Sequence, residues 1–264
     1  MASTPIILKT TSNIAHRLES SVRVEKWSPS FDREMCFSAT VSFSAAAILL
    51  GTGSLTLHYS RKAPFAYRMW AMIPLLFGVQ QGFEGLVWLA LHAGNSAATL
   101  DFALGFHFFS HFLWLWWIPL ASGLLEPHKT RKMLFFGIGL FGFLTSGAVY
   151  GMMLLHPEWM HVHVQGHSIV YDYIAPYRSD IHLPITPLML YGLIILIPLL
   201  LSSMGSIRIF GVLVLLSMAL ASWIHNAAFV SVWCFFAAII SLYLLHFLRL
   251  AAHVTPDMAT AQNS

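Results

Sequence analysis

The stretch LDFALGFHFFSHFLWLWWIPLASGLL, residues 100–125, decides the fold class of this chain. It exceeds the roughly 20 mainly apolar residues that a helix needs to cross the hydrocarbon core of a bilayer. The same bias extends over all 264 residues, of which 57% are hydrophobic and 9% are charged. Soluble domains average about 25% charged residues. We therefore predict an all-α protein embedded in a lipid bilayer.

Seven apolar runs of this kind follow one another along the chain, and no alternating strand pattern competes with them. Helices are therefore the spanning structure that satisfies the backbone hydrogen bonds. Pro74, Pro119 and Pro198 lie inside runs and are expected to kink them. The seven predicted spans are residues 37–57, 65–91, 100–125, 133–155, 185–201, 207–224 and 227–250.

The two ends of the chain differ from the spans in composition. Residues 1–34 hold five of the 14 basic and four of the 11 acidic residues, without an apolar run. We interpret them as a disordered tail, with translation initiating at Met35 as one explanation and a targeting presequence as the other. Residues 251–264 form a second polar tail. The predicted membrane domain is therefore residues 35–250.

The basic residues of the connections predict the orientation. Eight Lys and Arg residues of the first, third and fifth connections and the C-terminal end fall on one side of the membrane, and Arg178 alone falls on the other. Positive residues favour the cytoplasmic side. This places the C-terminus in the cytoplasm and the start of the first span outside, in an inner-membrane protein of a bacterium. A formal net charge of +3 is too small to indicate a nucleic-acid partner.

Three ionisable residues inside the spans are candidate functional groups: Glu84, His107 and His111. A charged side chain at the centre of a bilayer costs about 2.5–3.5 kcal/mol on insertion scales, so such residues are functional hypotheses. His107 and His111 are four residues apart and share one helix face. Gln80 and Gln81 share the face of Glu84. We take Glu84 and His111 as candidate acid/base residues in the outer half of the membrane.

The connection between the fourth and fifth spans adds five histidines on the predicted outer side. His161 and His163 would share one face of an extended segment. One outward-facing crevice that collects imidazole and carboxylate groups would suit a transition metal such as Zn, Fe or Cu. The spacing matches no established metal motif. The candidate ligands are Glu84, His107, His111, His167 and His225.

Each of these features also has a structural interpretation. The span histidines would then hydrogen-bond across a helix interface or to Glu84, at about 0.6 kcal/mol per contact. The loop histidines would be solvated, and His225 would be an interfacial residue. Three tryptophans of the third span, Trp114, Trp116 and Trp117, are interpreted as membrane anchors or lipid contacts.

Four separated motifs resemble an uncharacterised family of polytopic bacterial membrane proteins that begin with Met-Cys-Phe-Ser-Ala. They are MCFSAT from Met35, IPLLFGVQQGFEGLVW from Ile73, SHFLW from Ser110, and FVSVWCFFAA from Phe229. The resemblance covers about residues 35–250 and implies a multi-pass membrane domain without an established activity. It places Glu84, His111, His167 with Tyr171, and Cys234 in family motifs.

Three classes of function remain open. The first is a membrane-embedded metal-dependent enzyme that acts on a lipid or small apolar substrate, with Glu84 and the histidines as ligands or acid/base groups. The second is a proton-coupled transporter in which Glu84 and His111 relay protons. The third is a sensor or assembly protein whose outer loop binds a metal. A rhodopsin is excluded because the seventh span has no Lys for a Schiff base.

Overall fold

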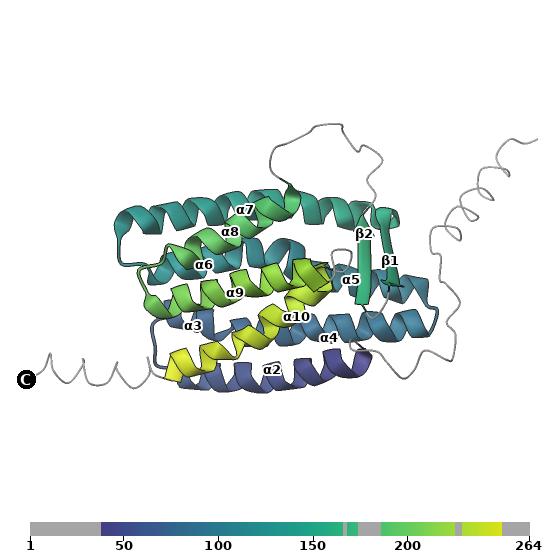
Figure 1. The fold of residues 1–264 in the computed structure, drawn as a ribbon, viewed down its shortest axis with the longest axis horizontal. Coiled ribbons are helices and arrows are strands. Elements are labelled where there is room, and N and C mark those ends of the chain that lie inside the picture. Colours follow the sequence, from purple (N-terminus) through teal and green to yellow (C-terminus); the bar gives the residue numbers. More distant parts are fainter. Residues whose placement is uncertain (1–37, 166–167, 174–185, 225–228, 250–264) are drawn as a thin grey trace, which may run out of the picture.

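The computed structural model describes residues 38–165, 168–173, 186–224 and 229–249. They form a bundle of helices that run nearly side by side, with a small hairpin lying across one end (Figure 1). The helices are α2 (Ala39–Tyr59), α3 (Phe65–Ala71), α4 (Ile73–His92), α5 (Ser96–His107), α6 (Trp114–Leu125), α7 (Lys129–Leu155), α8 (Pro187–Leu200), α9 (Gly205–Ile224) and α10 (Phe229–Ser241). Residues 243–249 are also helical.

The helix positions agree with the predicted spans, but the prediction of seven transmembrane helices is confirmed only in part. Three segments are long and apolar enough to cross a membrane: α2, residues 96–125 and α7. They indicate that the chain is membrane-associated. By contrast, α8 has 14 residues, about 21 Å at 1.5 Å per residue, which is shorter than the roughly 30 Å hydrocarbon core.

Two of the predicted spans are interrupted as helices. The second is divided at Met72 into α3 and α4, where Pro74 occupies the first turn of α4 and leaves the carbonyl of Trp70 without its usual helical donor. The third continues from α5 into a π-helix, η2 (Phe108–Leu113), and then into α6. At the end of η2 the backbone N–H of Trp114 donates to the carbonyl of Phe109, five residues back. This wider turn carries His111.

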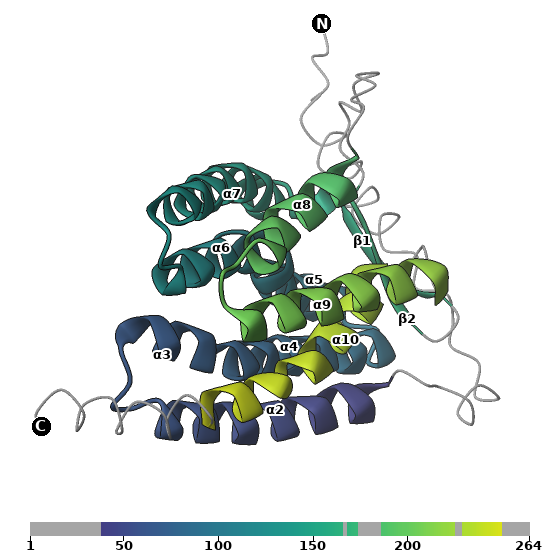
Figure 2. The same ribbon diagram turned by 60° about the vertical axis from the view of Figure 1, so that its left-hand side comes forward.

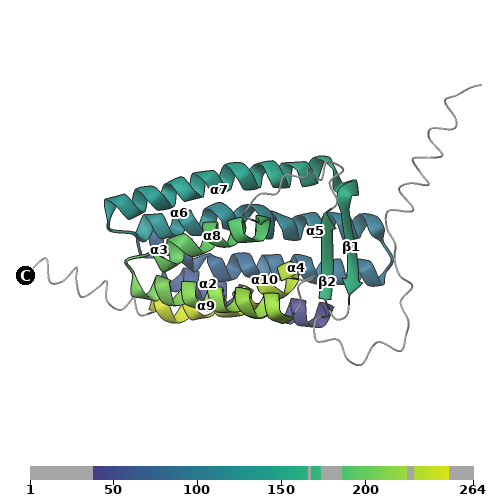
Figure 3. The same cartoon turned by 45° about the horizontal axis from the view of Figure 1, so that its top comes forward.

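The described residues are mostly helical, as predicted, but they also contain an antiparallel hairpin that the apolar pattern did not predict. After a short 3₁₀ turn, η3 (Pro157–Trp159), strand β1 (Met160–Gln165) pairs with β2 (Ser168–Tyr173). One face of the hairpin packs against the bundle through Ile169 and its apolar neighbours. Figure 3 shows the hairpin standing across the ends of α4 and α5. The strand was not recognised in the sequence because histidines, which are only weakly polar, alternate with valines in β1.

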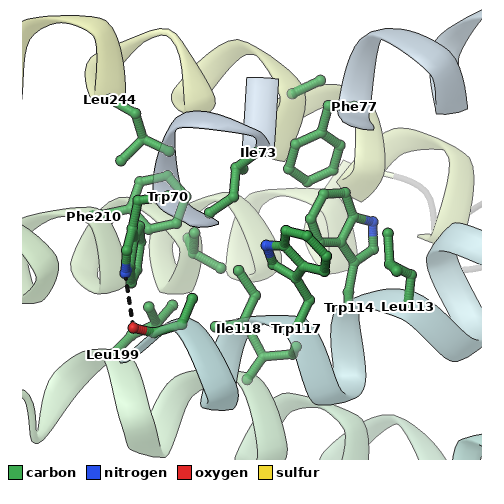
Figure 4. Packing of buried hydrophobic residues seen from close by; sticks show 14 of the residues in the cluster. Trp70, Ile73, Phe77, Leu113, Trp114, Trp117, Ile118, Leu199, Phe210 and Leu244 are labelled. Atoms are coloured by element: carbon green, nitrogen blue, oxygen red, sulfur yellow. Dashed lines mark hydrogen bonds between the residues drawn. The ribbon is translucent and has the colours of Figure 1, made fainter. Parts of the chain in front are cut away.

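A core of aromatic and aliphatic side chains fills the bundle between α3, α4, α6, α8 and α9 (Figure 4). Trp70 is fully buried and donates its indole N–H to the carbonyl of Ala121, at 3.1 Å. Trp114 and Trp117, with 3% and 9% exposure, belong to the same core. The interpretation of these two residues as membrane anchors was therefore wrong. The third predicted span lies largely inside the bundle, which explains the error. In its apolar 18-residue stretch 61% of the residues are buried, against 22% in that of α7.

Small residues bring the helix backbones close together. A Cβ atom on Gly53 of α2 would lie 2.5 Å from the backbone nitrogen of Leu75 in α4. A Cβ atom on Gly142 of α7 would clash with the carbonyl oxygen of Leu115 in α6. That carbonyl lacks a helical donor because the residue four positions later is Pro119. Within lipid, helices are not driven together by the hydrophobic effect. Close backbone contact at small residues stabilises their association by van der Waals packing instead.

A hydrogen-bonded clasp joins two connections at the end of the bundle opposite the hairpin. The carboxylate of Glu126, just after α6, accepts from the backbone N–H of Ser203 at 2.8 Å and from that of His128 at 3.3 Å. Arg131 donates to the hydroxyl of Ser203. Burial opposes ionisation of Glu126, but these hydrogen bonds outweigh it and lower the pKa of the carboxyl. The clasp fixes the start of α9 relative to the start of α7.

The α6–α7 contact provides a matched pair of glycine substitutions. We expect Gly142→Ala to lower the free energy of unfolding by about 1–3 kcal/mol, because the new methyl group must displace backbone. Gly137→Ala, on the same helix, adds a methyl group with no atom within 4 Å and should be neutral or stabilising. Thermal unfolding in detergent measures both variants. Equal melting temperatures for the two would contradict the described packing.

Candidate functional site

Glu84 lies inside the bundle with 3% exposure, together with Gln80 and Gln81 at 0%. The amide of Gln81 donates to Oε2 of Glu84 at 3.1 Å. The indole N–H of Trp114 donates to Oε1 of Gln80 at 2.8 Å, and its ring stacks on Phe77 at 4.2 Å between centroids. The spacing of three and four residues predicted that these α4 side chains share a face. The face points into the bundle and not toward lipid.

The two span histidines are in ring contact, with centroids 4.6 Å apart. Nδ1 of His107 lies 2.8 Å from the carbonyl oxygen of Ala103. A carbonyl can only accept, so Nδ1 carries the proton and Nε2 of a neutral ring presents its lone pair. This orientation suits a general base or a metal ligand. Nδ1 of His111 lies 3.0 Å from the hydroxyl of Ser110.

The π-helix accounts for the position of His111. A π-helical turn contains one residue more than an α-helical turn and frequently occurs at functional sites. Here it begins directly after His107 and includes Ser110 and His111. His107 is 2% exposed, whereas His111 is half-buried at the wall of a cavity.

Tyr171 of the hairpin contacts His107 and lies within electrostatic range of Glu84. Its ring lies edge to face with that of His107, at 4.7 Å, and stacks on Phe106 at 5.2 Å. Burial, and then the negative charge of Glu84, raise the pKa of Tyr171 well above its ordinary value. The phenol therefore stays protonated at neutral pH. The hairpin thus contributes a residue to the polar group inside the bundle.

Three buried polar atoms of this group have no hydrogen-bond partner among the described residues: Nε2 of Gln80, Oε1 of Gln81 and the hydroxyl of Tyr171. Cys234 of α10, a free and buried cysteine, lies within electrostatic range of both Glu84 and Tyr171. Leaving a buried polar atom unpaired costs about 1–3 kcal/mol. The group therefore offers a donor, an acceptor and a hydroxyl to a small polar species. We refer to Gln80, Gln81, Glu84, His107, His111, Tyr171 and Cys234 as the polar group.

A cavity of about 290 Å³ adjoins the polar group. Ser110 and His111 form one wall, and Trp233 and Cys234 of α10 form another. The remaining walls come from α7 and α8, two helices whose outer faces are visible in Figure 2. Val149 of α7 and Leu190 of α8 line the cavity and are 48% and 36% exposed. The cavity therefore reaches the apolar surface of the bundle between these two helices.

The structure brings some of the predicted site residues together and separates others. Glu84, His107 and His111 belong to the polar group, whereas His167 and His225 lie outside the described residues. His161 and His163 share a hairpin face with the exposed Asp172 and the buried Val170, and both imidazoles are partly exposed. The convergence of all the histidines in one crevice remains a prediction.

The metal ligands remain a prediction. Within the described ranges, no three His, Cys, Asp or Glu residues are grouped closely enough to hold a metal ion. The motif resemblance already pointed to Tyr171 and Cys234. The role of Trp114 was missed, because a tryptophan in a membrane span is usually taken for a lipid contact.

The fold and the polar group define a class: a helical membrane-associated protein with acid, amide and imidazole side chains buried beside an apolar cavity. The chain belongs to a family of unknown function, DUF6629, whose model matches residues 35–260. This confirms the resemblance drawn from the motifs. No curated protein and no solved structure matches the chain.

The contribution of the hydrogen bond between Trp114 and Gln80 to stability can be tested by substitution. We expect Trp114→Phe to lower the free energy of unfolding by about 1–2 kcal/mol, because a buried acceptor loses its donor. Trp116→Phe makes the same change in ring size, but the indole N–H of Trp116 has no partner in the described part of the chain. Thermal unfolding of both variants in detergent measures the difference. An equal loss in both would assign the effect to ring volume.

Proposed function

We propose that this protein binds an amphiphile or small apolar molecule from the bilayer in the α7–α8 cavity and holds the polar end of that molecule at His111. The observation that carries the proposal is that His111 belongs to the polar group and also lines the cavity. Its ring contacts His107 within the polar group and also lines the 290 Å³ cavity. Ligand pockets are mostly apolar and contain a few polar groups that fix orientation.

The proposal includes the topology of the chain. Seven spans, formed by α2, α3–α4, α5–η2–α6, α7, α8, α9 and α10 with its continuation, place the start of the first span outside and the C-terminus in the cytoplasm. The basic residues of the connections support this orientation. In a bacterial inner membrane, a cysteine introduced at Asp172 should then react with an impermeant maleimide added to intact cells. A cysteine at Lys129 should not react, provided that Cys36, which precedes the first span, is replaced by serine in both variants.

The polar group supplies acid/base chemistry to a bound molecule. Glu84 and His111 are the proposed acid/base residues, because a buried carboxyl and an imidazole can exchange a proton at neutral pH. Tyr171 and Gln81 orient the carboxyl and the His107 ring. The proposed enzyme therefore acts on the polar end of an apolar substrate within the membrane.

A filled cavity tests the binding step. We expect Leu190→Trp to reduce saturable photo-crosslinking of a diazirine-labelled palmitate in membranes by roughly tenfold, because the indole occupies space that is apolar and open. Leu193→Trp is the control, since Leu193 lies on the same helix, is 45% exposed and does not line the cavity. Crosslinking that both variants retain would contradict the proposed cavity.

Transition-metal binding is a second candidate, favoured by the Nδ1–H bond from His107 to Ala103, which presents Nε2 as ligating His residues do. Metal analysis of purified wild type, Glu84→Gln and His111→Ala tests it. Stoichiometric Zn, Fe or Cu in wild type, lost in both variants and retained in His246→Ala, is the expected result for a metal-dependent enzyme. Metal retained in all three variants would assign it to another place in the chain.

A further inference from the structure

The end of the bundle opposite the hairpin carries every Lys and Arg residue that the structure describes. Figure 1 shows this end, where α2, α6 and α8 finish and α3, α7 and α9 begin. The hydrogen bond from Arg131 to Ser203 and the contact of the Arg249 guanidinium with the ring of Tyr59, at 5.0 Å, join its connections. We call this surface the basic end. Its eight cations are Arg61, Lys62, Arg68, Lys129, Arg131, Lys132, Arg208 and Arg249.

Acidic side chains of the described residues do not neutralise this positive charge. Asp101, Glu158 and Asp172 lie toward the hairpin, and Glu84 lies inside the bundle. The remaining described carboxylate, Glu126, is held by the hydrogen bonds of the clasp. None of the eight cations lies within 4 Å of a described carboxylate oxygen. A concentration of like charge attracts anions from outside the chain.

Arg208 differs from the other cations because it borders a groove on the surface of α9. The groove, of about 390 Å³, is shallow and open, and its described lining consists of Gly205, Arg208, Ile209, Val212 and Leu213. The last four follow Gly205 by three, four, seven and eight residues, so all five share one face of the helix. Ile209 and Val212 are 53% and 46% exposed. The groove is therefore charged at the basic end and apolar along the turns that follow.

We propose that the α9 groove binds an anionic phospholipid of the leaflet that meets the basic end. The phosphate lies against the guanidinium of Arg208, and an acyl chain runs along Ile209, Val212 and Leu213. This inference does not depend on the proposed function, since the groove and the α7–α8 cavity share no lining residue. It requires only that the chain lies in a bilayer.

The chemistry of the groove selects this ligand. A guanidinium is weakly hydrated and presents several N–H donors, which fit phosphate oxygens. The side chain of Arg208 makes no hydrogen bond, ion pair or ring contact with the described residues, whereas the guanidinium groups of Arg61, Arg68, Arg131 and Arg249 each contact a ring or a polar side chain. A free phosphate would leave the apolar face uncovered. The ammonium group of a zwitterionic lipid would lie among like charges, which is unfavourable.

Photo-crosslinking with a diazirine-labelled phosphatidylglycerol, in nanodiscs of phosphatidylcholine, tests the site. We expect saturable adducts on residues 205–213, mapped by mass spectrometry, that unlabelled phosphatidylglycerol removes and inorganic phosphate does not. Arg208→Gln should weaken binding roughly fivefold, the effect of one basic residue near an anionic membrane surface. The control Lys62→Gln removes the same charge at an exposed position of the basic end, outside the groove. It should weaken binding much less, because salt screens distant charges.

A second pair of variants tests the apolar part of the groove. Val212→Trp fills the groove and should lower the yield of adducts on residues 205–213, although Arg208 is intact. Leu216→Trp is the control, since Leu216 lies on the same helix, is 60% exposed and does not line the groove. All four substituted side chains are exposed. The variants should therefore keep the wild-type melting temperature, which thermal unfolding in detergent verifies.

Three results would contradict the inference. Equal losses in Arg208→Gln and Lys62→Gln would assign binding to the general field of the basic end. Equal labelling of residues 205–213 by a diazirine-labelled phosphatidylcholine would show ordinary lipid contact. Removal of the adducts by inorganic phosphate would indicate a site for free phosphate. Crosslinking of palmitate in the α7–α8 cavity should be the same in wild type and Arg208→Gln, so the failure of one proposal leaves the other standing.

Discussion

The fold depends on satisfying buried polar atoms where water cannot reach them. The hydrogen bond from Gln81 to Glu84 and that from Trp114 to Gln80 do this for two acceptor oxygens on the face of α4 that points into the bundle. An unpaired polar atom there costs more than an average hydrogen bond returns. The position of α6 beside α4 is thus fixed by an indole N–H as well as by apolar packing.

Much of the architecture follows from the sequence, because apolar length alone marks a helix in a membrane. The boundaries of α2 and α7 lie within four residues of the predicted ones. The hairpin could not be anticipated from hydropathy, since histidines alternate with valines in β1 and both kinds of side chain are only partly buried. The π-helix was also hidden, because its residues have the same apolar pattern as the α-helices on either side.

The candidate site could be predicted in part, because an ionisable side chain inside an apolar span has a high free-energy cost. Glu84, His107 and His111 stood out because they interrupt apolar runs. Which groups surround them depends on long-range packing: Tyr171 and Cys234 come from segments far from α4 in the chain. The convergence of all the histidines stays a prediction, and within the hairpin His161 and His163 lie on the face opposite to Tyr171. The proton relay of a transporter stays a prediction for the same group.

Tyr171 reaches the bundle from a hairpin that is joined to the helices by chain on both sides. An antibody fragment that binds the exposed side of this hairpin would displace the Tyr171 ring. That ring stacks on Phe106 and contacts the imidazole of His107. The buried polar group is thereby linked to the surface of the hairpin. If the proposed function holds, a molecule bound at that surface would change the polar group without entering the bundle.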